Sequence, residues 1–412
     1  MLTVEQAQAQ VMSEISVGPA EAVTLDESLG RILREDVIAA QDLPPADNSS
    51  MDGYAVRAED LAELPVRMRV MDDIAAGHPT SRALEPGTAM RIMTGAFVPE
   101  GADTVVQVEL TDGGTEMVTV AKALARGANI RRRGEDMRAG DVVIRKGVRI
   151  GPAEIAMLAA AQKTAVQVGR RPTVAILSTG DELIDAGETL TTGKIVNTNG
   201  PLLAALVREA GAIPRVLGIV RDTKEATIAA LEKALESDFV LSSGGVSVGA
   251  FDFVKEALDA LGAETKFWRV AMKPGKPVVL SRLRDRVILG LPGNPVSTFV
   301  SFHLFAAPAL RKAMGREGDL FPSVVFARLE TPLKSPGDRR VYFRVHVSAR
   351  DGELHAKPLA SQGSGSLTSM LGANGLAVVE PEVALVEAGA MAPVLLIGAV
   401  SSGTASRRDG RG

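Results

Sequence analysis

The segment SSGGVSVGAFD, residues 242–252, has the residue types of a loop that binds an anion. An apolar run over 238–243 precedes it and a helical pattern follows, and backbone amides at such a turn often face a phosphate. The loop lacks the cation of a P-loop, because Ala250 and Phe251 stand where Lys and Ser or Thr would be required. A tight turn capped by Asp252 explains the same pattern equally well. The loop offers the hydroxyls of Ser242, Ser243 and Ser247, and the binding candidates are Ser242, Gly244, Gly245, Ser247 and Gly249.

Acidic residues follow three successive apolar runs that are typical of strands. Glu182 lies in STGDEL after the first run, Asp222 in VRD after the second, and Asp252 after the third. A solvated turn or a helix cap is a sufficient explanation for each acid alone. The carboxyl ends of parallel strands open on one crevice, however, so the three carboxylates are expected to face the same space. Carboxylates gathered in this way suit Mg²⁺.

Two further loops add positive charge and hydrogen-bond donors. MKPGKP places Lys273 and Lys276 three residues apart among prolines that restrict the backbone, although lysines are more often only surface charges. GLPGNPVST ends another predicted strand and opens a helix, where the amides and a serine hydroxyl suit an oxyanion, and a proline-rich helix start is an equally good local reading. The candidates in this second loop are Pro292, Gly293, Asn294, Pro295 and Ser297.

Composition narrows the chemistry further. The 412 residues include no cysteine and four widely separated histidines, which argues against disulfides, thiolate chemistry and a zinc site. A metal would need oxygen ligands, as Mg²⁺ does. The net charge of -4 gives no broad basic field, so nucleic acid is not expected as a principal partner. The crevice therefore suits a phosphate ester or anhydride.

The elements that position these loops follow from alternating strand and helix patterns over 172–320. Near-continuous apolar strands in such an alternation indicate an α/β fold with a doubly wound, mostly parallel sheet. Residues 1–40 read as helices, with patterns at 3–15 and 24–36, and residues 46–140 read as short strands. Short strands over 321–400 indicate a small all-β unit.

The two ends of the chain carry little further information. The start has no basic segment followed by an apolar one, and the most apolar late stretch, 383–400, is broken by Glu387, Gly389 and Pro393. We therefore expect no membrane segment and a cytoplasmic protein. The polar tail at 401–412 is predicted to be disordered.

The motifs taken together resemble those of the molybdopterin molybdenumtransferase family, MoeA and the gephyrin E domain. The segments that carry the resemblance are SSGGVSVGAFDF, STGDEL, MKPGKPV, GLPGNPVS, DNSSMDGYAVR (47–57), PGTAMRIMTGA (86–96), GADTVVQVE (101–109) and NIRRRGEDMRAGD (129–141). The match runs from the first residues to about 400, in the order of the family's four segments.

The resemblance implies a homodimer of four-domain subunits with shared active sites. Its domains would be a discontinuous helical domain I (1–45 and 141–171), an inserted β-rich domain II (46–140), an α/β molybdopterin-binding domain III (172–320) and a β-barrel domain IV (321–400). The implied reaction inserts molybdate into adenylylated molybdopterin, with Mg²⁺-assisted hydrolysis of the anhydride and release of AMP. Molybdopterin adenylyltransferase and apo-molybdoenzymes would be transient partners.

Carried over motif by motif, the resemblance assigns the site residues. Catalytic roles fall on Asp52, Thr94, Asp136, Glu182, Asp222 and Asp252, and the last three would hold the metal. Lys273, Lys276 and Ser297 would contact phosphate or molybdate, and Arg131 would join Asp52, Thr94 and Asp136 in completing a partner subunit's crevice. In the C-terminal segment the motif is looser, and it suggests Arg340, Arg344 and Ser364 near the molybdate. Taken alone, the residues of domain II are equally well explained as turn, strand-end or solvated surface residues.

Two alternatives stay open from the sequence. A homologue that handles tungstate would carry the same residues, because the two oxyanions are nearly equal in size and charge. A gephyrin-like scaffold is the other, although the intact acids and lysines favour an enzyme.

Overall fold

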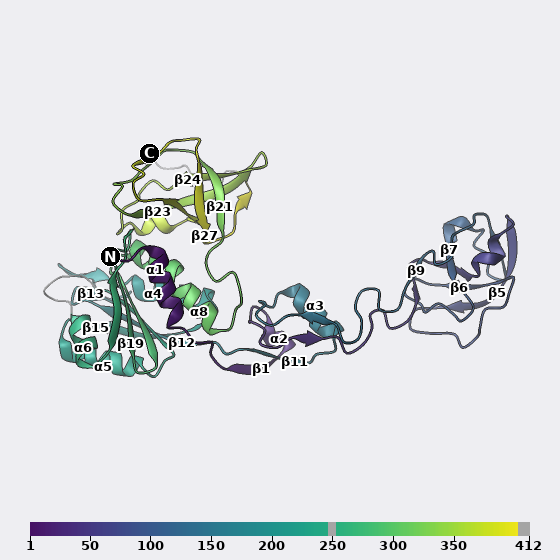
Figure 1. Cartoon of the computed structure of the whole chain (residues 1–412), viewed down its shortest axis with the longest axis horizontal. Coiled ribbons are helices and arrows are strands. Elements are labelled where there is room, and N and C mark those ends of the chain that lie inside the picture. The colour runs from purple at the N-terminus through teal and green to yellow at the C-terminus, as the bar shows by residue number, and fades with distance from the viewer. Residues whose placement is uncertain (246–252, 403–412) are drawn as a thin grey trace.

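The computed structural model of the chain describes residues 1–245 and 253–402. The molecule is elongated, with an α/β unit and a C-terminal β unit stacked at one end, a small mixed unit in the middle and a β-rich unit at the far end (Figure 1). The predictions for Ser247, Gly249, Asp252 and residues 403–412 lie outside the described residues.

The α/β unit contains a six-stranded sheet of order β15-β12-β16-β20-β19-β17. Neighbours among the first four strands are parallel, and β19 runs antiparallel to both β20 and β17. The expected doubly wound, mostly parallel sheet is confirmed. The strands are β12 (Thr173–Thr179), β15 (Ile213–Val220), β16 (Phe239–Ser243), β17 (Glu264–Arg269), β19 (Pro277–Leu283) and β20 (Arg286–Leu291), and the helices are α4 (Asn199–Glu209), α5 (Lys224–Ala234), α6 (Phe253–Ala260), α7 (Pro295–Ser301) and α8 (Ala307–Ala313).

Alternate residues of the central strands fill separate cores on the two faces of this sheet. In β12, Val174 and Ile176 belong to one core, and Ala175 and Leu177 belong to the other. This alternation is the two-residue period of a strand that is covered on both faces. The first helix, α1 (Val4–Ser13), places its buried residues in the first of these cores, so it packs with the α/β unit.

A π-helical turn, η3 (Phe302–Ala306), joins α7 to α8 into one long buried segment. Pro308 near the start of α8 has no N–H to donate to the Leu304 carbonyl four residues earlier. Gln8 of α1 donates its side-chain Nε2 to that carbonyl at 3.1 Å. The N-terminal helix therefore supports the segment that begins at the predicted PGNP loop.

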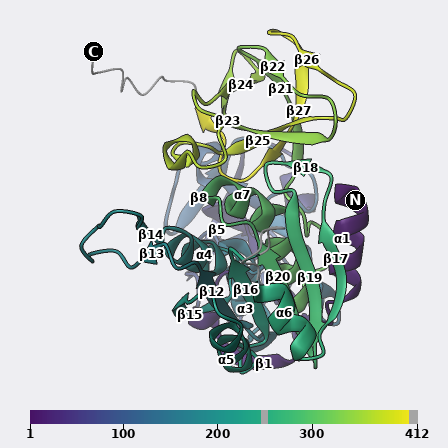
Figure 2. The same ribbon diagram turned by 90° about the vertical axis from the view of Figure 1, so that its left-hand side faces the viewer.

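The C-terminal unit is a closed five-stranded barrel, as expected. Its strands follow the order β23-β24-β21-β27-β25, and pairing of β25 with β23 closes the ring. β18 (Met272–Lys273), from the lysine loop, pairs with β23 in parallel and so ties the barrel to the α/β unit. Figure 2 shows the barrel stacked above the sheet, with β18 at the junction. The elements of this unit are β21 (Val324–Leu329), β22 (Leu333–Lys334), β23 (Arg340–Arg350), β24 (Glu353–Pro358), η4 (Leu367–Met370), β25 (Gly375–Val379), β26 (Leu385–Val386), β27 (Met391–Leu396) and β28 (Ser401–Ser402).

The middle unit combines two helices with two pairs of antiparallel strands. The helix predicted over 24–36 is wrong in extent, because only Leu25–Ser28 is helical. Gly30 has φ of 76°, and beyond it Ile32 and Leu33 form β-bridges with Arg149 and Val168. Long-range pairing has overridden the local helical pattern. The elements are β1 (Ala20–Thr24), α2 (Leu25–Ser28), β2 (Val37–Ile38), β10 (Val142–Ile144), α3 (Pro152–Ala160) and β11 (Ala165–Gly169).

The β-rich unit at the far end has a five-stranded sheet of order β7-β4-β6-β5-β8, with a small β3–β9 pair beside it. Two buried apolar clusters stabilise it on its own, and the fully buried Tyr54 lies in one of them. No helix within residues 1–245 and 253–402 is long and apolar enough to span a bilayer. The strands are β3 (Asn48–Ser49), β4 (Gly53–Val56), β5 (Val66–Ile74), β6 (Thr88–Ile92), β7 (Thr104–Gln107), β8 (Met117–Val120) and β9 (Ile130–Arg131).

Candidate active site

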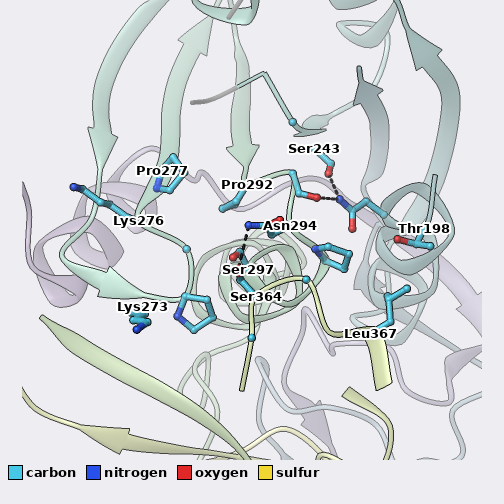
Figure 3. Close-up of a pocket in the computed structure, with 18 of the residues that line it drawn as sticks. Thr198, Ser243, Lys273, Lys276, Pro277, Pro292, Asn294, Ser297, Ser364 and Leu367 are labelled. Carbon is cyan, nitrogen blue, oxygen red and sulfur yellow. Dashed lines mark hydrogen bonds between the residues drawn. The ribbon is translucent and has the colours of Figure 1, made fainter. Parts of the chain in front are cut away.

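A cavity of about 1430 Å³ lies between the α/β unit and the barrel. Its floor consists of the residues that follow β12, β16 and β20, so it opens at the carboxyl ends of the strands, where doubly wound sheets bind ligands. The barrel contributes the opposite wall through most, but not all, of residues 334–344 and 362–367. Figure 3 shows side chains from both units converging on this space.

Glycines shape the floor where the opening motif begins. Gly244 and Gly245 line the cavity with φ of 89° and 64°. A Cβ on Gly244 would lie 2.7 Å from the Thr179 carbonyl oxygen, and one on Gly245 would lie 2.4 Å from a Val254 methyl carbon. Both the conformation and the close packing therefore require glycine at these two positions.

The two predicted lysines lie together on one side of the cavity (Figure 3). β18 holds the Lys273 backbone against β23 of the barrel, and the Lys276 carbonyl accepts a hydrogen bond from Val270 at 3.0 Å. Gly275 between them has φ of 103°, and a Cβ there would approach Ser301 Oγ to 2.8 Å. The loop is thus fixed on both sides of the lysine pair.

The predicted PGNP loop joins the two units directly. Asn294 Nδ2 donates to Ser364 Oγ at 3.1 Å, and the Val296 amide donates to the Ser364 carbonyl at 3.1 Å. Thr298 Oγ1 donates to the Pro292 carbonyl at 2.6 Å and closes the turn. Pro292, Gly293, Asn294, Pro295, Ser297 and Ser364 all line the cavity.

Arg344 lines the cavity but is almost fully buried, with 1% of its surface exposed. Its NH2 group donates to the carbonyls of Ser361 and Gly363 and to Ser369 Oγ, at 3.0, 3.2 and 3.0 Å. Burial lowers the pKa of the guanidinium to about 10. Arg344 therefore holds the loop that carries Ser364. Arg340 differs, because it forms ion pairs with Glu5 and Glu380 and is not among the lining residues.

Glu182 and Asp222 both line the cavity, on loops after β12 and β15. Asp222 Oδ2 accepts a hydrogen bond from the Asp181 amide at 3.1 Å, and the Asp222 amide donates to Asp181 Oδ1 at 3.3 Å. Burial raises the pKa of Asp222, and the negative charges of Asp181 and Glu182 raise it further. The carboxylates are thus close enough to repel one another, and a cation would relieve that repulsion.

Within the described part of the chain, no group of three or more acidic, histidine or cysteine side chains is arranged to hold a metal. Mg²⁺ commonly uses only one or two carboxylates and completes its shell with phosphate oxygens and water. Glu182 and Asp222 fit that requirement.

Four predicted residues lie away from this cavity, with Asp52, Thr94 and Arg131 in the β-rich unit and Asp136 in the connection between that unit and the middle one, where its amide bonds to the Leu43 carbonyl. Thr94 donates its amide and its hydroxyl to Asp52 Oδ1, both at 2.7 Å, and these bonds lower the pKa of Asp52. Asp52, Thr94, Arg131 and Asp136 are all exposed, and none lines the cavity of its own chain. Figure 1 places the β-rich unit at the opposite end of the molecule.

Several lining residues were not among the sequence candidates. Ser242, predicted to bind, is buried and does not line the cavity, whereas its neighbour Ser243 does. Adjacent residues of a strand point to opposite faces, so the alternation in β16 separates the two serines. Polar additions to the lining include Thr179, Asn197, Asn199, Lys334, Asp338, Arg339 and Gln362. The asparagines stand in NTNG at a predicted helix start, which was the available signal.

Family models match nearly the whole chain. Residues 2–161 match the MoeA N-terminal region (domain I and II), residues 175–312 match a probable molybdopterin binding domain, and residues 327–397 match the MoeA C-terminal region (domain IV). The curated molybdopterin molybdenumtransferase of Bacillus subtilis is 37% identical over 407 residues, which cover 96% of this chain and 94% of that protein. The protein with the same name from Nostoc is 41% identical over 369 residues, covering 87% and 84%.

A solved structure agrees with these matches. The molybdopterin biosynthesis moeA protein from Pyrococcus horikoshii OT3 superposes with a TM-score of 0.83 at 30% identity, covering 96% of this chain and 100% of that one. The resemblance seen in the motifs is confirmed: the chain belongs to the molybdopterin molybdenumtransferase family.

Proposed function

We propose that this protein inserts molybdate into adenylylated molybdopterin, with Mg²⁺-assisted hydrolysis of the anhydride and release of AMP. The observation that carries the proposal is the composition of one cavity, which combines Lys273 and Lys276 with Glu182 and Asp222. Cations that neutralise anionic oxygens, together with carboxylates that suit a divalent ion, are what a phosphate anhydride and an oxyanion require.

Each group has a role that its position supports. The two lysines balance negative charge on molybdate and phosphate oxygens, and Ser297 and the PGNP loop orient those oxygens. Glu182 and Asp222 would hold Mg²⁺, together with Asp252 outside the described residues. When bound, the ion supplies Lewis-acid polarisation and neutralisation of charge on the diphosphate.

We also propose that the protein works as a homodimer in which the β-rich unit of one subunit completes the cavity of the other. The support is the exposed position of Asp52, Thr94, Arg131 and Asp136, remote from their own cavity. Asp52 is fixed by its two hydrogen bonds from Thr94, so it is presented as an ordered carboxylate. Transient partners would be the adenylyltransferase that supplies the substrate and the apo-molybdoenzymes that accept the product.

The proposal is tested by AMP release from adenylylated molybdopterin with Mg²⁺ and molybdate. We expect release that depends on both ions, and a parallel series with tungstate measures the preference between the two oxyanions. Release that is indifferent to molybdate would contradict the proposed reaction.

A further inference from the structure

Asn199, the first residue of α4, connects three elements around the cavity. Its Nδ2 donates to Ser243 Oγ at the end of β16, at 2.7 Å, and to the Gly293 carbonyl in the PGNP loop, at 2.6 Å (Figure 3). Because a carbonyl oxygen only accepts hydrogen bonds, the contact with Gly293 fixes which end of the amide carries the nitrogen. The position of Oδ1 then follows.

That oxygen is left over. Asn199 Oδ1 is buried and has no hydrogen-bond partner among residues 1–245 and 253–402. The residue is 8% exposed, yet it is part of the cavity lining. A buried carbonyl without a donor is unfavourable, and buried polar atoms in folded proteins are nearly always paired.

A second buried asparagine shows what full pairing looks like in this chain. Asn374 is 9% exposed and ties together two segments of the barrel. Its Oδ1 accepts from the Val347 amide at 2.6 Å, and its Nδ2 donates to the carbonyls of Val347 and Ala399 at 2.8 and 2.9 Å. Asn374 does not line the cavity. Asn199 also ties separate segments together, but its Oδ1 has no donor among the described residues. Unlike Asn374, Asn199 lines the cavity.

The backbone before Asn199 holds this arrangement in place. Asn197 Oδ1 accepts a hydrogen bond from the Gly200 amide at 3.0 Å, which closes the NTNG turn. A Cβ at position 200 would lie 3.0 Å from Asn197 Nδ2, so glycine suits the turn. The orientation of Asn199 is therefore set before any ligand binds.

We infer that Asn199 Oδ1 is a binding contact of the cavity and accepts a hydrogen bond from an N–H or O–H group of the substrate. The inference rests on the proposed function and adds a recognition residue to it. Two parts of adenylylated molybdopterin offer such donors, namely the pterin N–H groups and the ribose hydroxyls. The two sources share one chemistry and are separated by the choice of probe.

The test is calorimetric titration of wild type, Asn199→Ala and Asn374→Ala with AMP and with adenylylated molybdopterin. We expect Asn199→Ala to weaken binding about tenfold, the size of one hydrogen bond, and Asn374→Ala to lower thermal stability without weakening binding. Weaker AMP binding identifies the ribose, and 2′- or 3′-deoxy-AMP then loses no further affinity in Asn199→Ala. Weaker binding of adenylylated molybdopterin alone identifies the pterin.

The opposite results are equally clear. Wild-type affinity of Asn199→Ala for both ligands, or equal weakening by Asn374→Ala, overturns the inference while the proposed function stands. If the wild type binds neither ligand, the proposed function fails and the inference fails with it. Should Asn199→Ala not fold, Asn199→Ser removes the carbonyl oxygen and leaves a small polar side chain in its place, so binding about tenfold weaker is expected and wild-type affinity for both ligands overturns the inference.

Discussion

The predicted site residues of the cavity and those of the β-rich unit differ in how the fold brings them together. In the cavity, distant parts of the sequence meet within one chain, since the PGNP loop bonds to Ser364 of the barrel and the lysine loop pairs with β23. In the β-rich unit, Asp52 and Thr94 bond to each other on an exposed surface at the other end of the molecule. One chain assembles part of the proposed site, and we propose that a second chain supplies the rest.

The largest expected loss of activity comes from a change in the cavity. Lys276→Ala removes a cation that balances charge on anionic oxygens, and we expect AMP release to fall about a hundredfold. Lys233→Ala, which removes an exposed lysine at the end of α5, serves as the charge-matched control. Equal activity of the two variants in a steady-state assay would mean that the lysine loop does not contact substrate.

The next effect concerns the acids of the same cavity. Asp222→Asn removes a carboxylate proposed to hold Mg²⁺, and we expect half-maximal AMP release to need at least about tenfold more Mg²⁺. Asp259→Asn, an exposed acid on α6, controls for the change in net charge. An unchanged Mg²⁺ titration for Asp222→Asn would move the metal site elsewhere.

A smaller effect is expected on stability, from a change in the lysine loop that lines the cavity. Gly275→Ala brings a Cβ to 2.8 Å from Ser301 Oγ and 2.9 Å from Met272 Cε at a φ of 103°. We expect urea unfolding to show a loss of about 1–3 kcal/mol, accompanied by weaker molybdate dependence. Gly262→Ala has a similar positive φ of 74° with nothing within 4 Å, so it isolates the contact from the conformation. Equal losses for both would show that the contact is unimportant.

The smallest expected effect is on the pH dependence of stability, through His303 in the π-helical turn η3. His303 is buried next to Phe299, and burial lowers its pKa to about 4, below the ordinary value near 6.5. The unfolded chain therefore binds this proton more readily, and stability falls as the pH falls below 6.5. We expect His303→Leu to remove about 1 kcal/mol of the loss between pH 6.5 and 5.5, measured by urea unfolding at both pH values. An unchanged pH slope in His303→Leu would rule out this origin.

Sequence patterns sufficed for the elements whose local preference agrees with their tertiary environment. The alternating strands and helices over 172–320 are such a case, because the strands supply buried apolar residues to cores on both faces of the sheet and the helices add buried residues to the same cores. Residues 24–36 are the opposite case, since pairing of Leu33 with Val168 outweighs the helical pattern. A helical pattern in one segment carries no information about the distant strand with which that segment pairs.

The site residues likewise divide into those that local sequence identifies and those that depend on the three-dimensional fold. Lys276 and the PGNP loop were recognisable because glycine and proline fix a backbone that exposes a charge or an amide. Asn199 was missed because its significance depends on where Ser243 and Gly293 lie in space. The sequence offered Ser242 and Ser243 together, and which of them faces the cavity depends on the register of the strand.

The shared site is tested most directly by mixing two variants, each altered in one of the two regions. Lys276→Ala damages the cavity and Asp52→Ala damages the β-rich unit, so each homodimer is expected to be nearly inactive. After subunit exchange in equal amounts, half of the dimers are mixed and each has one intact site, so AMP release should recover to about a quarter of wild type. Formation of mixed dimers without any recovery would contradict a site built from two subunits.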